Sequence, residues 1–233
     1  MQPTRQLEDA RVFRRLGRPI TRVLTDDPVA AFTFDDGPEP DYTPKTLGVL
    51  KDFGAKATFF MVGEAARQHP NIVKEVAEAG HAVCNHSWSH QRFPLISSLK
   101  CIGELRKCRR ALEPYGRNLF RPPYGMNNGR SNLLVSLCGY KAIGWCLDVK
   151  DWCEPSAAVM MEGLVRGISP GCIILLHDGL YVRSEEEKAR LLASGRVLQR
   201  ESMLAALEGT LKRLRNKFEF VTIPALLERG AVR

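Results

Sequence analysis

The chain has 233 residues, of which 44% are apolar and 26% charged, and these proportions exclude a disordered polypeptide. The formal net charge of +8 favours anionic partners, but the basic clusters at 5–22 and 212–217 lack the stacking aromatic rings of a nucleic-acid platform. We interpret both clusters as solvated faces, with contact to an anionic or lipid-linked surface as the alternative.

Short apolar runs alternate along the chain with helical patterns. Six runs rich in β-branched and aromatic residues predict strands, and 118–120 is a weaker seventh: 29–34, 57–62, 81–84, 140–146, 172–176 and 218–223. Apolar periodicity predicts the helices between and after them: 44–53, 64–79, 97–112, 131–138, 156–168 and a last one around 203–214. Strands that alternate with helices indicate parallel pairing with crossover connections.

Six or seven such units in one chain predict an α/β fold, a distorted (β/α) barrel of about seven parallel strands in a single domain. An open doubly wound sheet is the alternative, although no GxGxxG follows the first strand to support a dinucleotide site. We divide the chain into a basic N-terminal segment, 1–27, and a catalytic domain, 28–230.

Polar clusters follow five of the predicted strands. Asp35 and Asp36 follow the first, and "NHSWSH", "RPPYG", "LDVKDW" and "HDG" each follow a later one. In a β/α barrel the catalytic groups gather at the carboxyl ends of the strands. We therefore expect these five clusters to converge on one site.

The histidines of "HSWSH", His86 and His90, are four residues apart, and on a helical turn they would share one face. Two histidines with one aspartate form a typical catalytic zinc set, which also accepts Co²⁺, Ni²⁺ or Mn²⁺. The second aspartate could then take a proton from the attacking water. The alternatives are ordinary surface or core histidines and a solvated Asx-type turn at "DDG".

His177 follows a fully apolar strand and could act as a general acid, or it could be a buried histidine bonded to backbone. Asp151 could orient its imidazole and keep it protonated. Arg121 could pair with an aspartate and hold it ionised, and the amides of the turn at 122–125 could face an oxyanion. Trp152 is a candidate pocket wall.

The remaining histidines and most cysteines are expected to be structural. His69 and His81 lack partners, and Cys84, Cys146 and Cys153 are interpreted as packing residues. Seven thiols without a CxxC pair or other framework are typical of a reducing compartment, and no apolar signal region is visible. We expect a cytoplasmic location, and a secreted one only if a leader has been removed.

Taken together, "TFDDGP", "HSWSH", "RPPYG", "DVKDW" and "ILLHDG" resemble the five motifs of the polysaccharide deacetylases, the NodB-homology or carbohydrate esterase family 4 proteins. The resemblance covers residues 29 to about 227. It implies a distorted barrel and metal-dependent removal of N-acetyl groups from the N-acetylhexosamine units of a glycan or oligosaccharide. The absence of a visible signal is shared with the nodulation-type chitooligosaccharide deacetylases.

The resemblance also implies a role for each motif residue. It makes Asp36, His86 and His90 the metal ligands, Asp35 the base tethered by Arg121, His177 the acid beside Asp151, Tyr124 an oxyanion contact through its amide, and Trp152 with Leu175 the slot for the acetyl methyl. The charged segment 181–202 is longer than in many members and leaves substrate choice open. Two other hypotheses are a deacetylase or deformylase of a lipid-linked aminosugar, and a non-catalytic glycan-binding protein with the same fold.

Overall fold

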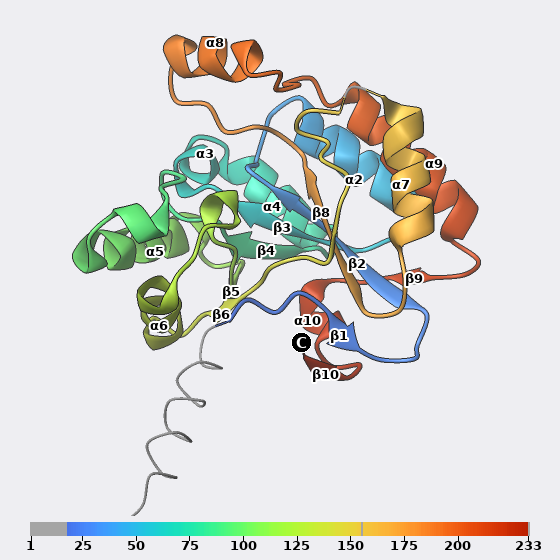
Figure 1. Cartoon of the computed structure of the whole chain (residues 1–233), viewed down its shortest axis with the longest axis horizontal. Coiled ribbons are helices and arrows are strands. Elements are labelled where there is room, and N and C mark those ends of the chain that lie inside the picture. Colours follow the sequence, from blue (N-terminus) through green and yellow to red (C-terminus); the bar gives the residue numbers. More distant parts are fainter. Residues whose placement is uncertain (1–17, 155, 233) are drawn as a thin grey trace, which may run out of the picture.

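The computed structural model describes residues 18–154 and 156–232, and it is built around one curled parallel sheet (Figure 1). The strands are β2 (Val29–Asp35), β3 (Ala57–Met61), β4 (Ala82–Asn85), β5 (Gly116–Phe120), β6 (Lys141–Ala142), β7 (Leu147–Asp148), β8 (Cys172–His177) and β9 (Glu219–Phe220). Seven follow the spatial order β6-β5-β4-β3-β2-β8-β7, while β9 pairs with β2 off this path. Every pairing within this sheet is parallel, so the predicted architecture is confirmed.

Helices connect the strands, and most of them, though not α8, pack around the sheet (Figure 1). They are α2 (Tyr42–Asp52), α3 (Gly63–Gln68), α4 (Pro70–Glu78), α5 (Ser98–Leu112), α6 (Gly129–Leu137), α7 (Ala157–Gly167), α8 (Glu185–Ala193), α9 (Glu201–Leu214) and α10 (Ile223–Leu226), with short 3₁₀ turns η1 (Phe93–Leu95) and η2 (Pro123–Gly125). A small antiparallel pair, β1 (Val23–Leu24) with β10 (Ala231–Val232), lies outside the main sheet.

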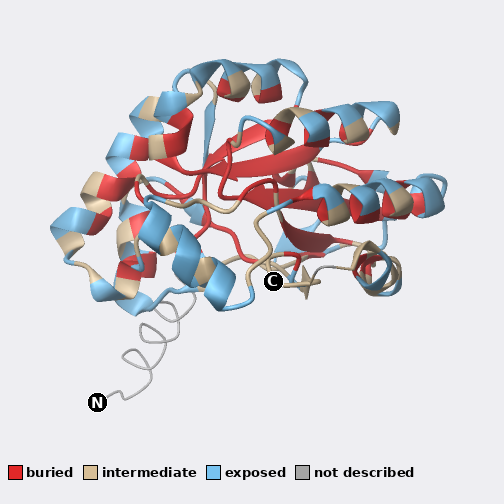
Figure 2. Cartoon of the chain, turned by 90° about the horizontal axis from the view of Figure 1, so that it is seen from above, coloured by how far each residue is buried: buried red, intermediate tan, exposed pale blue. Residues whose placement is uncertain are grey.

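The core lies on both faces of the central strands, which appear as the buried centre of the molecule in Figure 2. Every residue of β2 and β3 is buried, as expected for strands with helices or chain on both sides. Phe32 and Phe34 lie in the larger cluster with the apolar sides of α2 and α9, while Ala31 and Phe60 lie in a second cluster with Val23. Both clusters pack against β2, so this strand is held from both of its faces.

The predicted strand at 140–146 is divided in the structure. Its start, β6, pairs with β5, and its continuation, β7, pairs with β8 at the other end of the sheet. Between them Ile143 N donates to Phe120 O (2.8 Å) and Cys146 N donates to Ile173 O (3.0 Å). This one segment therefore spans the seam between the two ends of the curled sheet, because neither end has a long strand to close it.

Two other predictions need correction. The single helix expected at 64–79 is two helices, because Pro70 has no N–H to continue the first and instead begins the second. The strand expected at 218–223 is shorter, because Thr222 caps α10 with its side chain. Within the described residues, no helix is both long and apolar enough to span a bilayer.

The basic N-terminal segment lies partly outside the described residues, which exclude 1–17. Its last part contacts the body of the protein: Ile20 bridges Ile143, and Arg22 donates to Ser169 Oγ (3.0 Å) and to the carbonyl oxygen of Pro170 (2.9 Å). Arg22 is therefore a structural residue.

Candidate metal and catalytic site

The two adjacent aspartates lie at the carboxyl end of β2, where the chain leaves the sheet. Asp35 is the last residue of the strand and pairs in register with His177, the last residue of β8. Asp36 adopts a left-handed backbone conformation with φ of 74°. Such conformations are rare for residues with a Cβ. Both carboxylates still reach His86, whose Nε2 lies 3.4 Å from Asp36 Oδ1 and 3.7 Å from Asp35 Oδ2, so the two neighbours face one site from different positions.

His86 and His90 converge through a loop, and the helical turn expected from their spacing is absent. Residues 86–90 have no helical conformation, and Ser87 and His90 have positive φ angles of 68° and 52°. Glu104 of α5 holds this loop, because its carboxylate accepts bonds from Ser89 N (2.7 Å) and Ser89 Oγ (2.9 Å). Strained backbone of this kind persists where surrounding contacts over-determine it, and it clusters at functional sites.

Asp36, His86 and His90 are buried, and their ligand atoms all lie within 4.8 Å of one another. Asp36 Oδ1 is 3.4 Å from His86 Nε2 and 3.1 Å from His90 Nε2. Atoms bound at roughly 2.0–2.2 Å to one tetrahedral ion lie about 3.3–3.6 Å apart. The two Asp36–histidine separations are therefore close to those of a zinc-like site.

Hydrogen bonds and charge also prepare these residues as ligands. His86 Nδ1 lies 2.8 Å from the carbonyl oxygen of Arg121, which can only accept, so Nδ1 carries the proton and Nε2 is free to bind a cation. Burial would raise the pKa of Asp36, but the charge of His90 and hydrogen bonds to His86 and His90 hold it well below its ordinary value. A carboxylate and two imidazole nitrogens thus face one point.

Asp35 faces the same space and is held by a fully buried arginine. Arg121 Nη1 donates to Asp35 Oδ1 and to Thr33 Oγ1, both at 2.7 Å, and its Nη2 donates to Gly144 O at 2.8 Å. Asp35 Oδ2 is left toward the metal site, 3.7 Å from His86 Nε2. Burial lowers the pKa of Arg121, while Asp35 opposes that shift. The pairing positions one carboxylate oxygen and leaves the other available.

His177, which is partly buried, and Asp151, which is buried, form a dyad on the other side of the site. Asp151 Oδ1 accepts from His177 Nδ1 and Asp151 Oδ2 accepts from the backbone N of His177, both at 2.8 Å. Burial lowers the pKa of His177, but the charge and hydrogen bond of Asp151 outweigh it, with smaller contributions from Asp36 and Asp35, and raise the pKa to about 9. The imidazolium is thus the favoured form, with its Nε2 proton free to be donated.

Arg200 is a member of the site that sequence reasoning missed. Its side chain is fully buried, and Nη1 donates to Asp151 O at 3.1 Å and lies 3.5 Å from Asp151 Oδ2. It lies in the charged segment 181–202, 49 residues from Asp151, where no motif marks it. The only available signal was a lone arginine immediately before an amphipathic helix. Arg200 therefore contacts the aspartate of the dyad, as Arg121 contacts Asp35.

The rest of the segment 181–202 also contacts the site. Tyr181 N donates to Asp36 Oδ2 at 3.2 Å, and the Tyr181 hydroxyl donates to Glu64 at the start of α3. Beyond these residues α8 buries none of its side chains and stands clear of the sheet (Figure 1). The segment is therefore fastened at its two ends, near Tyr181 and near Arg200.

The residues expected to contact substrate differ in exposure: Tyr124 is exposed, Trp152 is partly exposed and Leu175 is buried. Tyr124 lies in the η2 turn with φ of 58°, its ring 4.4 Å from that of His90 and below Arg92. Trp152 is partly exposed, and the guanidinium of Arg196 lies 3.8 Å from its ring centroid. Leu175 is buried in β8, two residues before His177.

The histidines outside the motifs differ from those of the site. Burial lowers the pKa of His81 to about 4, and its Nδ1 accepts from Ala57 N at 3.1 Å, so it is a structural residue as predicted.

Cys84 is buried, as expected of a packing residue. Cys146 is exposed, so its prediction as a packing residue is wrong.

Comparison with known proteins gives related sequences for this arrangement. The sequence profile described as polysaccharide deacetylase matches residues 22–143. A peptidoglycan-N-acetylglucosamine deacetylase of Bacillus cereus is 32% identical over 210 residues, which cover 88% of this chain and 91% of the relative. A chitooligosaccharide deacetylase of Sinorhizobium fredii is 32% identical over 167 residues, 70% of this chain and 77% of the relative. The chain spans 38% of a longer peptidoglycan deacetylase, PgdA, of Listeria monocytogenes.

Solved structures are similar over most of the chain. The Bc1960 peptidoglycan N-acetylglucosamine deacetylase matches with a TM-score of 0.78 and 28% identity, covering 91% of this chain and 94% of that one. A family 4 carbohydrate esterase from Streptomyces lividans, in complex with acetate, matches with a TM-score of 0.73 and 26% identity, covering 89% and 98%. The curled sheet and its helices are therefore shared with these enzymes.

Proposed function

The chain belongs to the polysaccharide deacetylase family, and from that premise we propose that it hydrolyses the N-acetyl groups of N-acetylglucosamine units in a glycan or oligosaccharide. The products are free acetate and a glucosamine unit. One observation carries the proposal: a buried Asp-His-His triad lies between a carboxylate paired with Arg121 and an imidazole paired with Asp151. Amide hydrolysis needs these three functions together, namely a cation site, a proton acceptor and a proton donor.

A divalent cation held by Asp36, His86 and His90 would supply Lewis acidity to the acetamide carbonyl and to water, and we propose Zn²⁺ as the ion. Asp35 accepts a proton from the water as its oxygen adds to the carbonyl carbon. Arg121 fixes which oxygen Asp35 presents, since Oδ1 is already bonded. This positioning makes Asp35 the base and Asp36 a ligand, although both are carboxylates on adjacent residues.

The tetrahedral adduct must then expel an amine, which is a poor leaving group unless its nitrogen is protonated. His177 supplies that proton from Nε2, because Nδ1 is bonded to Asp151. The carbon–nitrogen bond breaks, the amine leaves on the sugar and the acetyl group leaves as acetate. We assign the Tyr124 amide to the developing oxyanion, and Trp152 with Leu175 to the acetyl methyl.

The proposal is tested by acetate release from N-acetylglucosamine oligomers and from peptidoglycan fragments, with lipid-linked and N-formylated aminosugars assayed beside them. We expect acetate release that chelator abolishes and that stoichiometric Zn²⁺ restores, and metal analysis should find one ion per chain. Co²⁺, Ni²⁺ and Mn²⁺ should be compared in the same assay. Bound glycan with no metal-dependent release from any substrate would contradict the proposal and favour a binding protein.

A further inference from the structure

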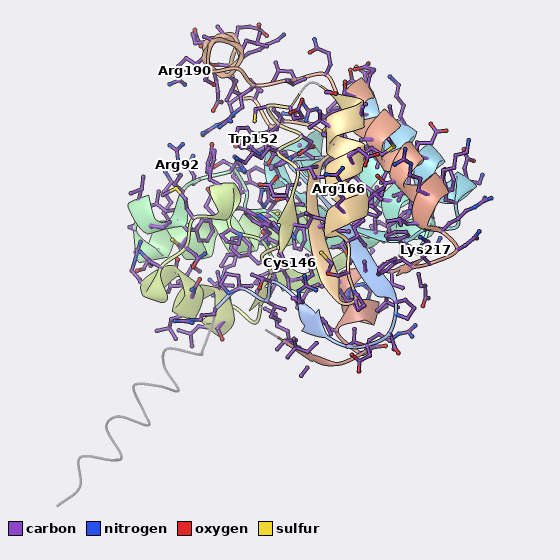
Figure 3. The ribbon with its side chains drawn as sticks, turned by 45° about the vertical axis from the view of Figure 1, so that its right-hand side comes forward. Arg92, Cys146, Trp152, Arg166, Arg190 and Lys217 are labelled. Carbon is purple, nitrogen blue, oxygen red and sulfur yellow. The ribbon has the colours of Figure 1, made fainter. Side chains whose placement is uncertain are left out.

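Cys146 and Cys172 lie side by side at the seam of the curled sheet, far in the chain from the metal ligands. Cys146 belongs to the segment that crosses between β6 and β7, and Cys172 begins β8. Their Sγ atoms are 2.9 Å apart, although non-bonded carbon atoms already prefer roughly 3.5–4.0 Å and sulfur is larger. Figure 3 shows Cys146 well separated from Trp152 at the rim of the site.

The backbones around the two thiols already lie at the spacing that a disulfide needs. Cys146 N donates to Ile173 O at 3.0 Å, and the β7–β8 register continues this pairing with Leu147 opposite Ile174. Cys146 therefore lies one residue out of register with Cys172, and a strand separation of about 4.8 Å combined with a rise of about 3.3 Å puts their Cα atoms about 5.8 Å apart, within the roughly 4.4–6.8 Å range of a disulfide. The pair could therefore bond with a sub-ångström to ångström movement of the side chains.

The two thiols differ in exposure, which gives each a separate part in the chemistry. Cys146 is exposed, while Cys172 is completely buried beneath it. The hydrogen bond with Cys172 is the largest influence on Cys146 and, helped to a lesser degree by Arg22, lowers the pKa of the Cys146 thiol to about 6. By contrast, burial raises the pKa of Cys84 and Cys108, which are typical of packing thiols.

We propose that Cys146 and Cys172 form a disulfide-bonding site that reacts with small-molecule disulfides through the exposed Cys146. The Cys146 thiolate attacks one sulfur of the small disulfide, forming a mixed disulfide and releasing one thiolate. Cys172 then loses its proton and attacks the Cys146 sulfur, which forms the protein disulfide and releases the second thiolate. Two protein thiols are oxidised and one small disulfide is reduced to two thiols.

The bond would join the start of β8 to the segment that spans the seam. These residues are 26 apart in sequence, and the loop between them contains α7 and Asp151. Closing a loop of this length removes conformational freedom from the unfolded chain and stabilises the fold. The disulfide would therefore stabilise the part of the sheet where the short strands β6 and β7 lie. It would use no side chain of the catalytic set.

The test is oxidation of the purified protein with oxidised glutathione, followed by thiol titration and peptide mass spectrometry after alkylation. We expect free thiols to fall from seven to five, because two are consumed, and a linked peptide pair containing Cys146 and Cys172. The Tm should rise by roughly 5–15 °C on oxidation. Cys146→Ser should abolish both changes, whereas the matched variant Cys153→Ser should retain the linked pair and the rise.

Persistent glutathione on Cys146 with Cys172 still reduced would overturn the proposal, as would a linkage that uses any other cysteine. Because Cys172 lies in the core and its variants could fold poorly, Cys146→Ser is the deciding variant. Neither readout depends on acetate release, so failure here leaves the proposed hydrolysis untouched, and failure of hydrolysis leaves the thiol result standing.

Discussion

The site contains two buried arginine–aspartate pairs, and they differ in how closely the arginine contacts the carboxylate and in which other group the carboxylate bonds. In the first pair Arg121 bonds Asp35 directly at 2.7 Å, and His86 Nε2 lies farther from that carboxylate, at 3.7 Å. In the second pair Arg200 is 3.5 Å from Asp151, and the carboxylate bonds His177 at 2.8 Å instead. Arg121 therefore positions Asp35, the proposed proton acceptor. Arg200 contacts Asp151, whose carboxylate favours the protonated form of His177.

The comparison explains how one small site can contain both a base and an acid. Pairing with an arginine favours the charged form of a carboxylate, and pairing with a carboxylate favours the protonated form of a histidine. These opposite protonation states coexist because each pair has its own buried partner and the cation site lies between them. The variants below would break one pair at a time and should give opposite or separable effects.

The largest effect is expected from Asp35→Asn, which keeps the shape of the side chain but removes the proton acceptor. We expect kcat to fall by about 10²- to 10⁴-fold, as is usual for loss of a general base. Bound metal, measured by elemental analysis, should remain, since Asp35 is not assigned as a ligand. Asp36→Asn is the matched control on the adjacent residue and should lose metal affinity. Equal metal loss in both variants would contradict the division of roles.

The second effect concerns the pH dependence of the acid. His177 must be protonated to act, so activity falls as pH rises through its pKa, which Asp151 raises. Asp151→Asn removes that negative charge, and the alkaline limb of kcat should move to lower pH by about one unit or more, each unit being about 1.4 kcal/mol. The measurement is a pH–rate profile of both proteins loaded with the same metal.

Asp148→Asn is the control for that profile. Asp148 also carries a carboxylate near His177, but its side chain bonds Lys150 N at 2.6 Å and makes no bond to the imidazole in the described structure. A shift as large as that of Asp151→Asn would mean that general loss of charge, and not the dyad, controls the acid.

Much of this arrangement could be predicted from sequence because it depends on local order. Parallel strands place their carboxyl ends at one edge, so polar clusters after the strands had to converge. The break before Pro70 was also predictable, since proline lacks the N–H that would continue a helix. The loop form of 86–90 was not, because it depends on positive φ angles held by Glu104 from a different helix.

Arg200 and the division of 140–146 could not be predicted for a related reason. A run of apolar residues shows that a strand can form but not which neighbours it will pair with, and here two neighbours share one run. Arg200 lies in a charged segment, and its role depends on a contact with Asp151 that only the folded chain makes. Long-range partners of this kind carry no short-range signal.

A smaller effect of opposite sign is expected from Arg200→Gln. Removing the buried positive charge beside Asp151 lets the carboxylate act more fully on His177, so the alkaline limb should move to higher pH, by less than the shift of Asp151→Asn. Arg200→Lys should restore most of the wild-type profile, because the charge returns. A Tm measurement accompanies the profile, since Arg200 is completely buried. A shift to lower pH, as in Asp151→Asn, would show that Arg200 only holds Asp151 in place.

The smallest effect is expected at the rim, where Arg196 lies over Trp152 and the backbone N of Val197 donates to Trp152 O at 2.9 Å. A cation–π contact at a partly exposed site contributes about 0.5–1 kcal/mol. Arg196→Ala should therefore raise KM about two- to five-fold with kcat almost unchanged, because both buried arginine pairs remain intact. Arg190→Ala, on the exposed face of α8, is the control and should leave both constants unchanged. A fall in kcat for Arg196→Ala alone would contradict this prediction. It would mean that the contact of Arg196 with Trp152, as well as buried Arg200, affects the catalytic step.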